Sequence, residues 1–356
     1  MRDMEWPQCY LKVGCLVIAI ATAVLKYFWR RKVFRKIEAD VDFKWEDVES
    51  GKYRPFKGKR SFHPSLGIKN LSREPEGLIL IENTYKDVTK LKKKLAKEHG
   101  KETLLACTDG VTEASVREFY EFSVHFLRSR YPQYFVSKGL FVHNKINGEI
   151  FPKSPKGFPL KTLLFYLASN LEEDFVILQK SGPQKECNEY YLKAAVNGFP
   201  AGFSPDVNLN KPILTIHRPV PEYQTRLQLS MARFFDRLTP DDIWVRFNWS
   251  VQVHNSLFNL ENHHAYDYEK IRELNFSEID FENGANLRVE RQVITRLPSL
   301  RANIMLVRTY LTPLRQIKEE GLEEDLIYAI DNLPDDLAVY KRKAEWGPAV
   351  KQYLKS

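Results

Sequence analysis

Cysteine is scarce in this chain, and its placement argues against a disulfide-stabilised fold. There are four cysteines among 356 residues, and Cys9 and Cys15 both fall in an apolar N-terminal segment. Cys107 and Cys187 leave a single pair for the rest of the chain, and no CxxC spacing occurs. Folds that depend on disulfides carry cysteine at a much higher density. We therefore expect a fold stabilised by its hydrophobic core, in a reducing compartment.

Glycine-rich loops, internal repeats and low-complexity tracts are also absent from the sequence. Without a loop of the Rossmann or phosphate-binding type, the sequence carries no motif for binding a nucleotide. The formal net charge of +8 is concentrated in two places, because residues 30–36 hold five basic side chains and residues 90–97 hold five lysines. A basic balance confined to short segments does not indicate a nucleic-acid surface, so we expect no nucleic-acid partner.

The N-terminal segment 9–29, CYLKVGCLVIAIATAVLKYFW, is strongly apolar. Its uninterrupted run from Val13 to Leu25 is flanked by Lys12 and Lys26, whose side chains can reach a membrane interface. The segment predicts a single membrane-spanning anchor, with a cleaved signal peptide and an interfacial helix as the alternatives. The basic flank that follows predicts that the C-terminal domain lies in the cytosol, on the endoplasmic reticulum or another endomembrane.

Composition predicts four regions along the chain. They are a membrane anchor with a basic flank at 1–36, a linker and irregular lead-in at 37–77, a main domain at 78–320 and a helical tail at 321–356. Hydrophobic residues make up 43% of the chain and aromatic residues 13%, values typical of a globular protein. The main domain is therefore expected to bury a large core.

Hydrophobic periodicity predicts an α+β fold centred on residues 213–253. Residues 213–217 form an apolar run that predicts a strand ending before Pro219. Apolar residues recur at spacings of three and four over 226–238, which predicts an amphipathic helix. Between Val245 and Val253 apolar and polar residues alternate, which predicts a half-buried strand with one polar face.

Hydrophobic periodicity also predicts elements in the rest of the chain. Further helices are predicted at 88–99, 112–130, 160–171 and beyond Pro313, further strands at 78–82, 175–179 and 190–196, and a hairpin at 287–311. Residues 254–284 are polar and poorly periodic, so they predict a long loop over the sheet. The adjacent His263 and His264 in this loop could ligate a metal, but neighbouring side chains usually point apart, which favours a surface position.

Several short motifs occur in an order that resembles one known family. They are IHRPVP at 216–221, SMARFFDRL at 230–238, VRFNWS at 245–250, LRVERQVITRLP at 287–298 and VRTYLTPL at 307–314. Weaker matches are KYRPFK at 52–57, SRYPQYF at 129–135 and EEDFVIL at 172–178. Together these motifs resemble the heme-dependent oxidative N-demethylase alpha-subunit-like family over residues 43–317.

The resemblance implies a PAS-like, mostly antiparallel fold that binds heme b in the domain 78–320. It implies oxygen-dependent removal of a methyl group from a secondary amine or a related small N-methyl substrate. Electrons would come from a separate reductase, since the sequence carries no flavin or iron–sulfur signature. A non-catalytic heme or small-molecule sensor on a membrane is the alternative. A membrane-anchored transferase is more remote, suggested only by the anchor and two acidic pairs.

His217 is the first candidate for the heme ligand. Pro219 and Pro221 fix the backbone just beyond it, and histidine is one of the side chains that ligate heme iron. The alternative is a core histidine bonded to a neighbouring carbonyl group. His254, at the end of the polar strand face, is the second candidate ligand.

Charged and polar side chains complete the predicted site. Arg246 and Asn248 lie two residues apart and therefore on one strand face, where the arginine could hold a heme propionate and the asparagine could bond a ligand or substrate. Arg218 and Arg291 are further candidates for binding the cofactor. Glu290 could neutralise the ammonium ion of a secondary amine, or it could form an ion pair with Arg291. The predicted catalytic residues are therefore Asn248 and Glu290.

Overall fold

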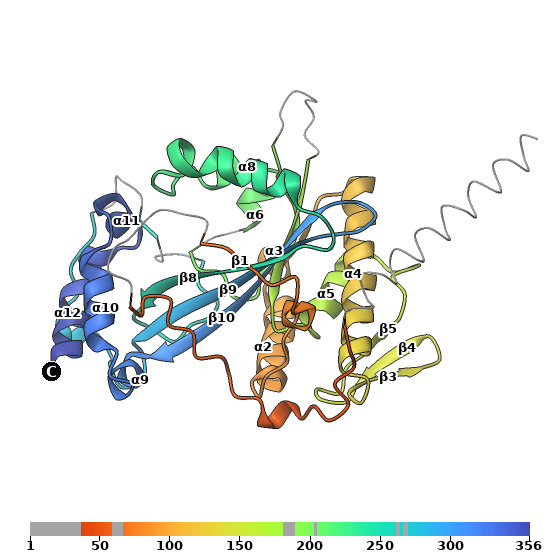
Figure 1. Ribbon diagram of the computed structural model, residues 1–356, viewed down its shortest axis with the longest axis horizontal. Helices are drawn as coiled ribbons and strands as arrows, with labels where there is room; N and C mark the ends of the chain where they lie inside the picture. The colour runs from red at the N-terminus through yellow and green to blue at the C-terminus, as the bar shows by residue number, and fades with distance from the viewer. Residues whose placement is uncertain (1–36, 59–66, 181–188, 203–204, 261–263, 266–269) are drawn as a thin grey trace, which may run out of the picture.

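The computed structural model describes residues 37–58, 67–180, 189–202, 205–260, 264–265 and 270–356. Its largest feature is a seven-stranded sheet made of β1 (Lys69–Asn70), β2 (Leu104–Ala106), β6 (Asp174–Gln179), β7 (Tyr191–Val196), β8 (Ile243–Gln252), β9 (Asn286–Arg296) and β10 (Asn303–Pro313). These strands are antiparallel in the order β1-β8-β9-β10-β6-β7-β2 (Figure 1). A separate antiparallel sheet joins β3 (Phe135–Lys138), β4 (Phe141–Asn144) and β5 (Ile150–Pro152).

Helices flank the large sheet. They are α2 (Tyr85–Glu98), α3 (Gly100–Thr103), α4 (Gly110–Arg130), α5 (Leu160–Ala168), α6 (Pro205–Asn208), α7 (Ile213–Ile216), α8 (Gln228–Arg237), α9 (Leu314–Glu319), α10 (Glu323–Asp331), α11 (Asp335–Tyr340) and α12 (Lys343–Lys355). In Figure 1, α8 lies above β8, while α10, α11 and α12 gather at the left end of the central strands. The predicted α+β class, with a mostly antiparallel sheet and flanking helices, is confirmed.

Side chains alternate along the central strands, so each strand contributes to two layers. On one face Ile177 and Leu306 are fully buried in the main core, which also contains side chains of α2, α4 and α5. Farther along the same face Val289 packs with residues of α9, α10 and α12. On the opposite face Ile294 and Met305 pack in a smaller cluster with residues of α7 and α8. That smaller cluster covers only part of its face.

Several predicted elements are confirmed. The helices predicted at 88–99, 112–130, 160–171 and 226–238 correspond to α2, α4, α5 and α8, and the predicted hairpin corresponds to β9 and β10. The acidic region beyond Pro313 is helical, as predicted. Its apolar residues Leu326, Ile327 and Ile330 are buried against the ends of the central strands. The three short strands of the small sheet were not predicted, because their apolar runs are too brief to show a period.

Two predicted strands are wrong. Residues 213–217 form the single helical turn α7, closed by a 2.9 Å hydrogen bond from the His217 N–H to the Ile213 carbonyl oxygen. Residues 78–82 join no sheet, because their backbone groups bond to side chains. The Leu80 N–H donates to Glu173 at 3.1 Å, and Arg308 donates to the Leu80 carbonyl oxygen at 2.8 Å. Periodicity alone does not identify the conformation of such short apolar runs.

The predicted single-pass membrane location needs correction. Across the residues that the structure describes, no helix has both the length and the apolar character needed to cross a bilayer. The predicted anchor at 9–29 itself lies outside the described residues.

A buried ionic cluster lies on the main-core face of the sheet. Arg308 of β10 is 3% exposed and lies 2.8 Å from Glu82, 2.7 Å from Glu172 and 3.5 Å from Glu173. The Tyr310 hydroxyl donates to Glu82 at 3.1 Å. Burial, reinforced by Glu173 and Glu82 and opposed by Arg308, raises the pKa of Glu172 to about 7. The cluster is therefore more stable when Glu172 carries a proton.

This raised pKa predicts a pH-dependent effect of Glu172→Gln. The native state retains the Glu172 proton up to about pH 7, whereas an unfolded carboxyl group, with an ordinary pKa of 4.5, loses it earlier. The contribution of Glu172 to the free energy of unfolding therefore falls as the pH rises from 4.5 to 7. At about 1.4 kcal/mol per pH unit, the loss is about 3 kcal/mol. Glutamine removes this loss. The free energy of unfolding of the variant minus that of wild type should therefore increase from pH 5 to pH 8.

Urea unfolding at both pH values measures the effect. Glu46→Gln, at an exposed position in the lead-in, is the control and should show the same difference from wild type at pH 5 and pH 8. If the difference in free energy of unfolding between Glu172→Gln and wild type is also the same at pH 5 and pH 8, the raised pKa of Glu172 is contradicted.

Candidate functional site

One face of the central strands is lined with polar groups where α8 no longer covers it. We call this surface the polar face; it comprises Arg246, Asn248, Ser250, Gln252, Arg288, Glu290, Gln292 and Thr309. The strand register places Arg246 opposite Gln292, Asn248 opposite Glu290, and Ser250 opposite Arg288. Thr309 of β10 lies opposite Glu290 on its other side. Residues directly opposite each other share a face, so the predicted polar side of β8 is confirmed and extends across β9.

His217 lies at the end of α7 in an orientation suited to ligation. Its Nδ1 is 3.0 Å from the carbonyl oxygen of Ile213, and its ring stacks on Tyr223 with centroids 4.6 Å apart and planes 17° from parallel. A carbonyl oxygen can only accept a hydrogen bond, so Nδ1 carries the hydrogen and Nε2 carries the lone pair. A hydrogen bond to a carbonyl group also fits the alternative of a core histidine. It is equally the bond that orients a ligating histidine.

His217 is neutral and close to the polar face. Burial lowers the pKa of its ring, the Ile213 carbonyl opposes this shift, and the positive charge of Arg246 lowers the pKa further. A neutral imidazole is the form that ligates a metal. Arg246 is thus the member of the polar face whose charge acts on the His217 ring.

Arg246 has an unsatisfied hydrogen-bond donor. Its Nε is buried and has no hydrogen-bond partner among the residues that the structure describes. Burial lowers the pKa of Arg246, and the charge of Glu290 opposes this shift. A buried guanidinium nitrogen without an acceptor is costly, so the position favours an anionic ligand group such as a propionate.

Glu290 and Asn248 lie side by side in the middle of the polar face. The Glu290 carboxylate accepts a hydrogen bond from Gln292 at 3.1 Å and lies 3.4 Å from Nε of Arg288. Glu290 therefore forms an ion pair with Arg288, and the predicted alternative of a pair with Arg291 is wrong. The opposed positions of Asn248 and Glu290 bring a carboxylate and an amide group into one small area.

Two predicted cofactor-binding residues lie elsewhere. Arg291 points to the other face of β9, where it is 5% exposed and donates to the carbonyl oxygen of Gly77. Arg218 is exposed just beyond α7, and its backbone N–H donates to Thr215 at 3.3 Å. The alternation of side chains along a strand explains why Arg291 cannot share a face with Glu290.

The second candidate ligand, His254, has a different hydrogen-bonding arrangement. Its Nδ1 lies 3.2 Å from the Ser256 N–H, which can only donate, so the neutral ring carries its hydrogen on Nε2. Nε2 in turn lies 3.3 Å from the side-chain amide of Asn259. The lone pair on Nδ1 is thus already engaged by the protein. His264 stacks on Tyr340 with centroids 4.2 Å apart, and burial, aided by Lys341, lowers its pKa to about 3. His263 lies outside the described residues.

Two cations of the site, Arg288 and Lys341, were not predicted from the sequence. Arg288 lies two residues before Glu290, so the alternation already used for β8 could have identified it. Lys341 follows α11 in the predicted tail, and its Nζ donates to the carbonyl oxygen of Trp249. Burial, together with the charge of Arg246 and against that of Glu290, lowers the pKa of Lys341 to about 8. No local pattern identifies this lysine, because only the packing of the tail brings it to β8.

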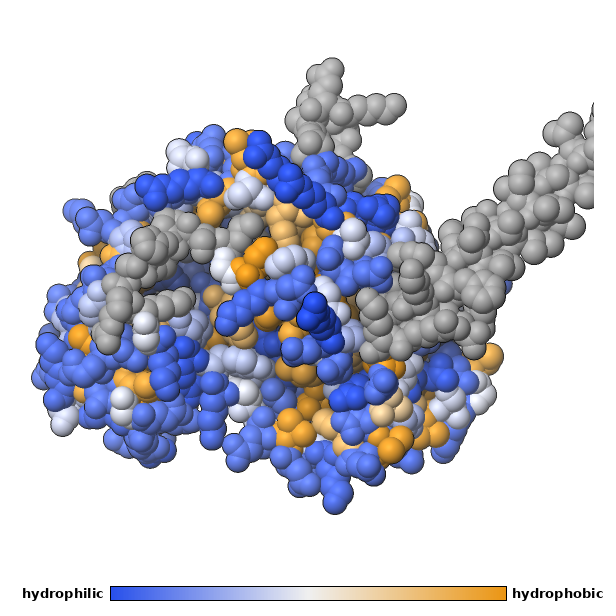
Figure 2. Space-filling view, viewed as in Figure 1, coloured by the Kyte–Doolittle hydropathy of each residue, from blue (hydrophilic) through white to orange (hydrophobic). Residues whose placement is uncertain are grey.

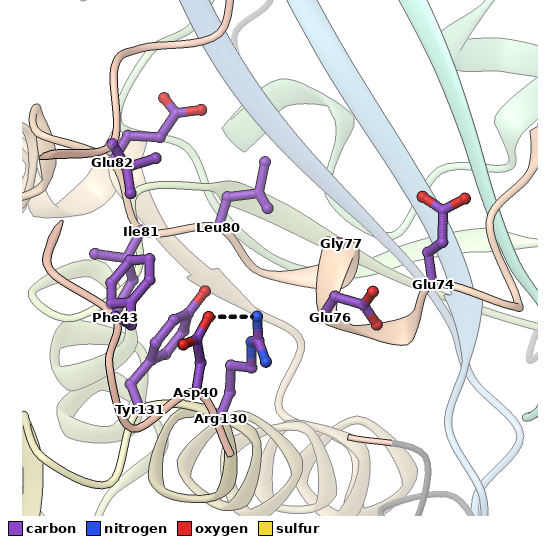
Figure 3. A pocket seen from close by; sticks show the side chains of 11 residues that line it. Asp40, Phe43, Glu74, Glu76, Gly77, Leu80, Ile81, Glu82, Arg130 and Tyr131 are labelled. Atoms are coloured by element: carbon purple, nitrogen blue, oxygen red, sulfur yellow. Dashed lines mark hydrogen bonds and ion pairs between the residues drawn. The ribbon is translucent and has the colours of Figure 1, made fainter. Parts of the chain in front are cut away.

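A pocket of about 210 Å³ lies next to the Arg308 cluster. It is lined by residues that include Asp40, Phe43, Glu82, Arg130 and Tyr131 (Figure 3). The carboxylate of Asp40 and the guanidinium group of Arg130, which both line it, form an ion pair at 2.9 Å. None of the predicted site residues lines this pocket, so the polar face remains the candidate site.

The two histidines provide a prediction that can be checked without a cofactor. In the heme-free protein at pH 8, ring nitrogen NMR should show His217 as the Nδ1–H tautomer and His254 as the Nε2–H tautomer. His217→Ala and His254→Ala assign the two sets of signals, and each histidine serves as the control for the other. An Nε2–H tautomer at His217 would contradict the hydrogen bond to Ile213.

Comparison with known proteins agrees with the order of motifs in the sequence. A search of curated proteins finds no match to this chain. The family described as haem-dependent oxidative N-demethylase, alpha subunit-like, matches residues 67–351, which is most of the chain. The matched region contains every described residue of the polar face as well as His217. The chain therefore belongs to the haem-dependent oxidative N-demethylase, alpha subunit-like family.

Proposed function

We propose that this protein binds heme b at the polar face, with His217 as the residue that would ligate the iron, and acts as an oxidative N-demethylase-like enzyme on a secondary amine. The observation that carries the proposal is the orientation of His217. Its Nδ1–H donates to the carbonyl oxygen of Ile213, so the lone pair on Nε2 is the one that could coordinate iron. This arrangement suits a PAS-like use of the fold, in which one sheet face holds the cofactor.

The neighbouring residues fit the same cofactor. The buried Nε of Arg246 needs an acceptor, and a heme propionate is an anionic acceptor of the right kind. When bound, the heme would supply the iron that activates oxygen. In this proposal the electrons come from a separate reductase.

Glu290 and Asn248 would bind the amine. A secondary amine is an ammonium ion at neutral pH, and a carboxylate stabilises such a charge in a partly desolvated site. Gln292 and Arg288 hold the Glu290 carboxylate in position. The amide of Asn248, directly opposite on β8, can bond the substrate or the distal side of the cofactor.

The absorption spectrum of the full chain, expressed with a supply of heme, tests His217. Wild type should show a stoichiometric Soret band, and His217→Ala should weaken heme binding by at least about tenfold because it removes the proposed iron ligand. His143→Ala, on β4 in the small sheet, is the matched control and should behave as wild type. A Soret band unchanged in position and intensity in His217→Ala would refute the assignment.

Glu290→Gln tests the amine-binding role. With an added reductase and a panel of secondary amines, the variant should lower kcat/KM for oxygen consumption by about 10- to 100-fold, the loss expected for one charge-assisted hydrogen bond. Its Soret band should stay unchanged. Glu282→Gln, an exposed glutamate before β9, should keep wild-type kinetics.

A heme-loaded wild-type protein that consumes no oxygen with any of these amines would contradict the enzymatic proposal. It would favour the sensor instead.

A further inference from the structure

A cavity of about 350 Å³ lies beside the polar face, where β8 ends. Its lining includes Gln252, His254, Asn259, Lys341 and Trp346. This volume lies within the range of small-molecule sites, about 300–1,000 Å³. On the side of the molecule drawn in Figure 2, hydrophilic residues predominate over the C-terminal helices that supply Lys341 and Trp346. Polar groups from separate stretches of chain thus converge on a space that a small polar molecule can occupy.

Lys341 connects this cavity to the polar face. It lines the cavity, its Nζ donates to the Trp249 carbonyl oxygen of β8, and its charge interacts with that of Glu290. An ammonium group has three N–H donors. Within the described residues, the hydrogen bond to Trp249 uses one of them. Lys341 can therefore donate to a ligand in the cavity without losing its present contact.

Arg288 places a second cation behind the cavity wall. It is 1% exposed, and its Nη1 lies 3.4 Å from Oε1 of Gln252, which lines the cavity. Its Nε lies 3.4 Å from the Glu290 carboxylate. Gln252 therefore stands between Arg288 and the cavity.

Around Glu290, positive charges outnumber negative ones. Arg246, Arg288 and Lys341 all interact with this one carboxylate. A simple dialkylammonium ion that approached Glu290 would thus meet more positive than negative charge. Partly buried charges need counterparts, so a ligand that brings its own anionic group removes the conflict.

We propose that the cavity holds the anionic end of the substrate, and that the substrate is an N-methyl amine carrying a carboxylate group. This inference rests on the proposed function and specifies its substrate class. The carboxylate lies against Lys341, and the ammonium group lies against Glu290. Arg246, beside His217, remains for the cofactor. The separation of positive and negative groups between cavity and strand thus selects a zwitterion.

Calorimetric titration of the full chain with N-methylglycine and with dimethylamine tests this inference. Wild type should bind N-methylglycine at least about tenfold more tightly than dimethylamine, because one charge-assisted hydrogen bond contributes about 1.5–3 kcal/mol. Lys341→Met should abolish most of this difference, and Lys341→Arg should restore part of it. Lys355→Met, at an exposed position at the end of α12, should have no effect. Circular dichroism of each variant confirms that it is folded.

The outcomes separate this inference from the heme assignment. Equal affinities of wild type for the two amines, or an equal loss of both in Lys341→Met, would overturn the substrate class even if the Soret band depends on His217. Binding of N-methylglycine that depends on Lys341 would support the cavity assignment even in protein that takes up no heme. Calorimetry needs no turnover, so the two claims fail independently.

Discussion

The antiparallel pairing of β8, β9 and β10 is the constraint on which the rest of this structure depends. β9 pairs with β10 along its whole length and with β8 from Asn286 to Thr295, and each pairing fixes which side chains share a face. One face buries apolar residues such as Val289 and Leu306, so a slip of one residue would expose the core and bury the charges. The cost of that exchange holds Asn248 opposite Glu290. The position of the candidate site is therefore a consequence of core packing.

The two faces of these strands carry opposite imbalances of charge. On the main-core face one guanidinium group, Arg308, is shared by three carboxylates, and Glu172 relieves the excess negative charge by holding a proton. On the polar face one carboxylate, Glu290, is shared by three cations. Arginine cannot release its proton at neutral pH, so the excess positive charge is best neutralised by anions from outside the chain. Heme propionates and a substrate carboxylate are both of this type.

The alternation of apolar and polar residues in the sequence is enough to predict which face of its own strand a side chain lies on. The alternation from Val245 to Val253 correctly predicted the polar side of β8, and the hairpin β9–β10 followed from its apolar runs. The same alternation, applied to β9, excludes Arg291 from the face of Glu290. The strand predicted at 213–217 is wrong, because three apolar residues within five fit a helical turn as well as a strand.

Proximity between distant segments could not be predicted in this way. His217 approaches Arg246 because α7 and α8 pack on the sheet, and Lys341 reaches Trp249 because the C-terminal helices pack against the strand ends. Neither contact leaves a spacing in the sequence. Pro219 and Pro221, together with the family motif, favour His217 among the histidines, whereas the orientation of its ring follows only from the structure.

A crystal structure of the full chain loaded with heme tests the central claim most directly. We predict iron bound by Nε2 of His217, Nδ1 still donating to Ile213, and a propionate against Nε of Arg246. Heme bound on the Arg308 side of the sheet, or iron ligated by a residue other than His217, would contradict the account.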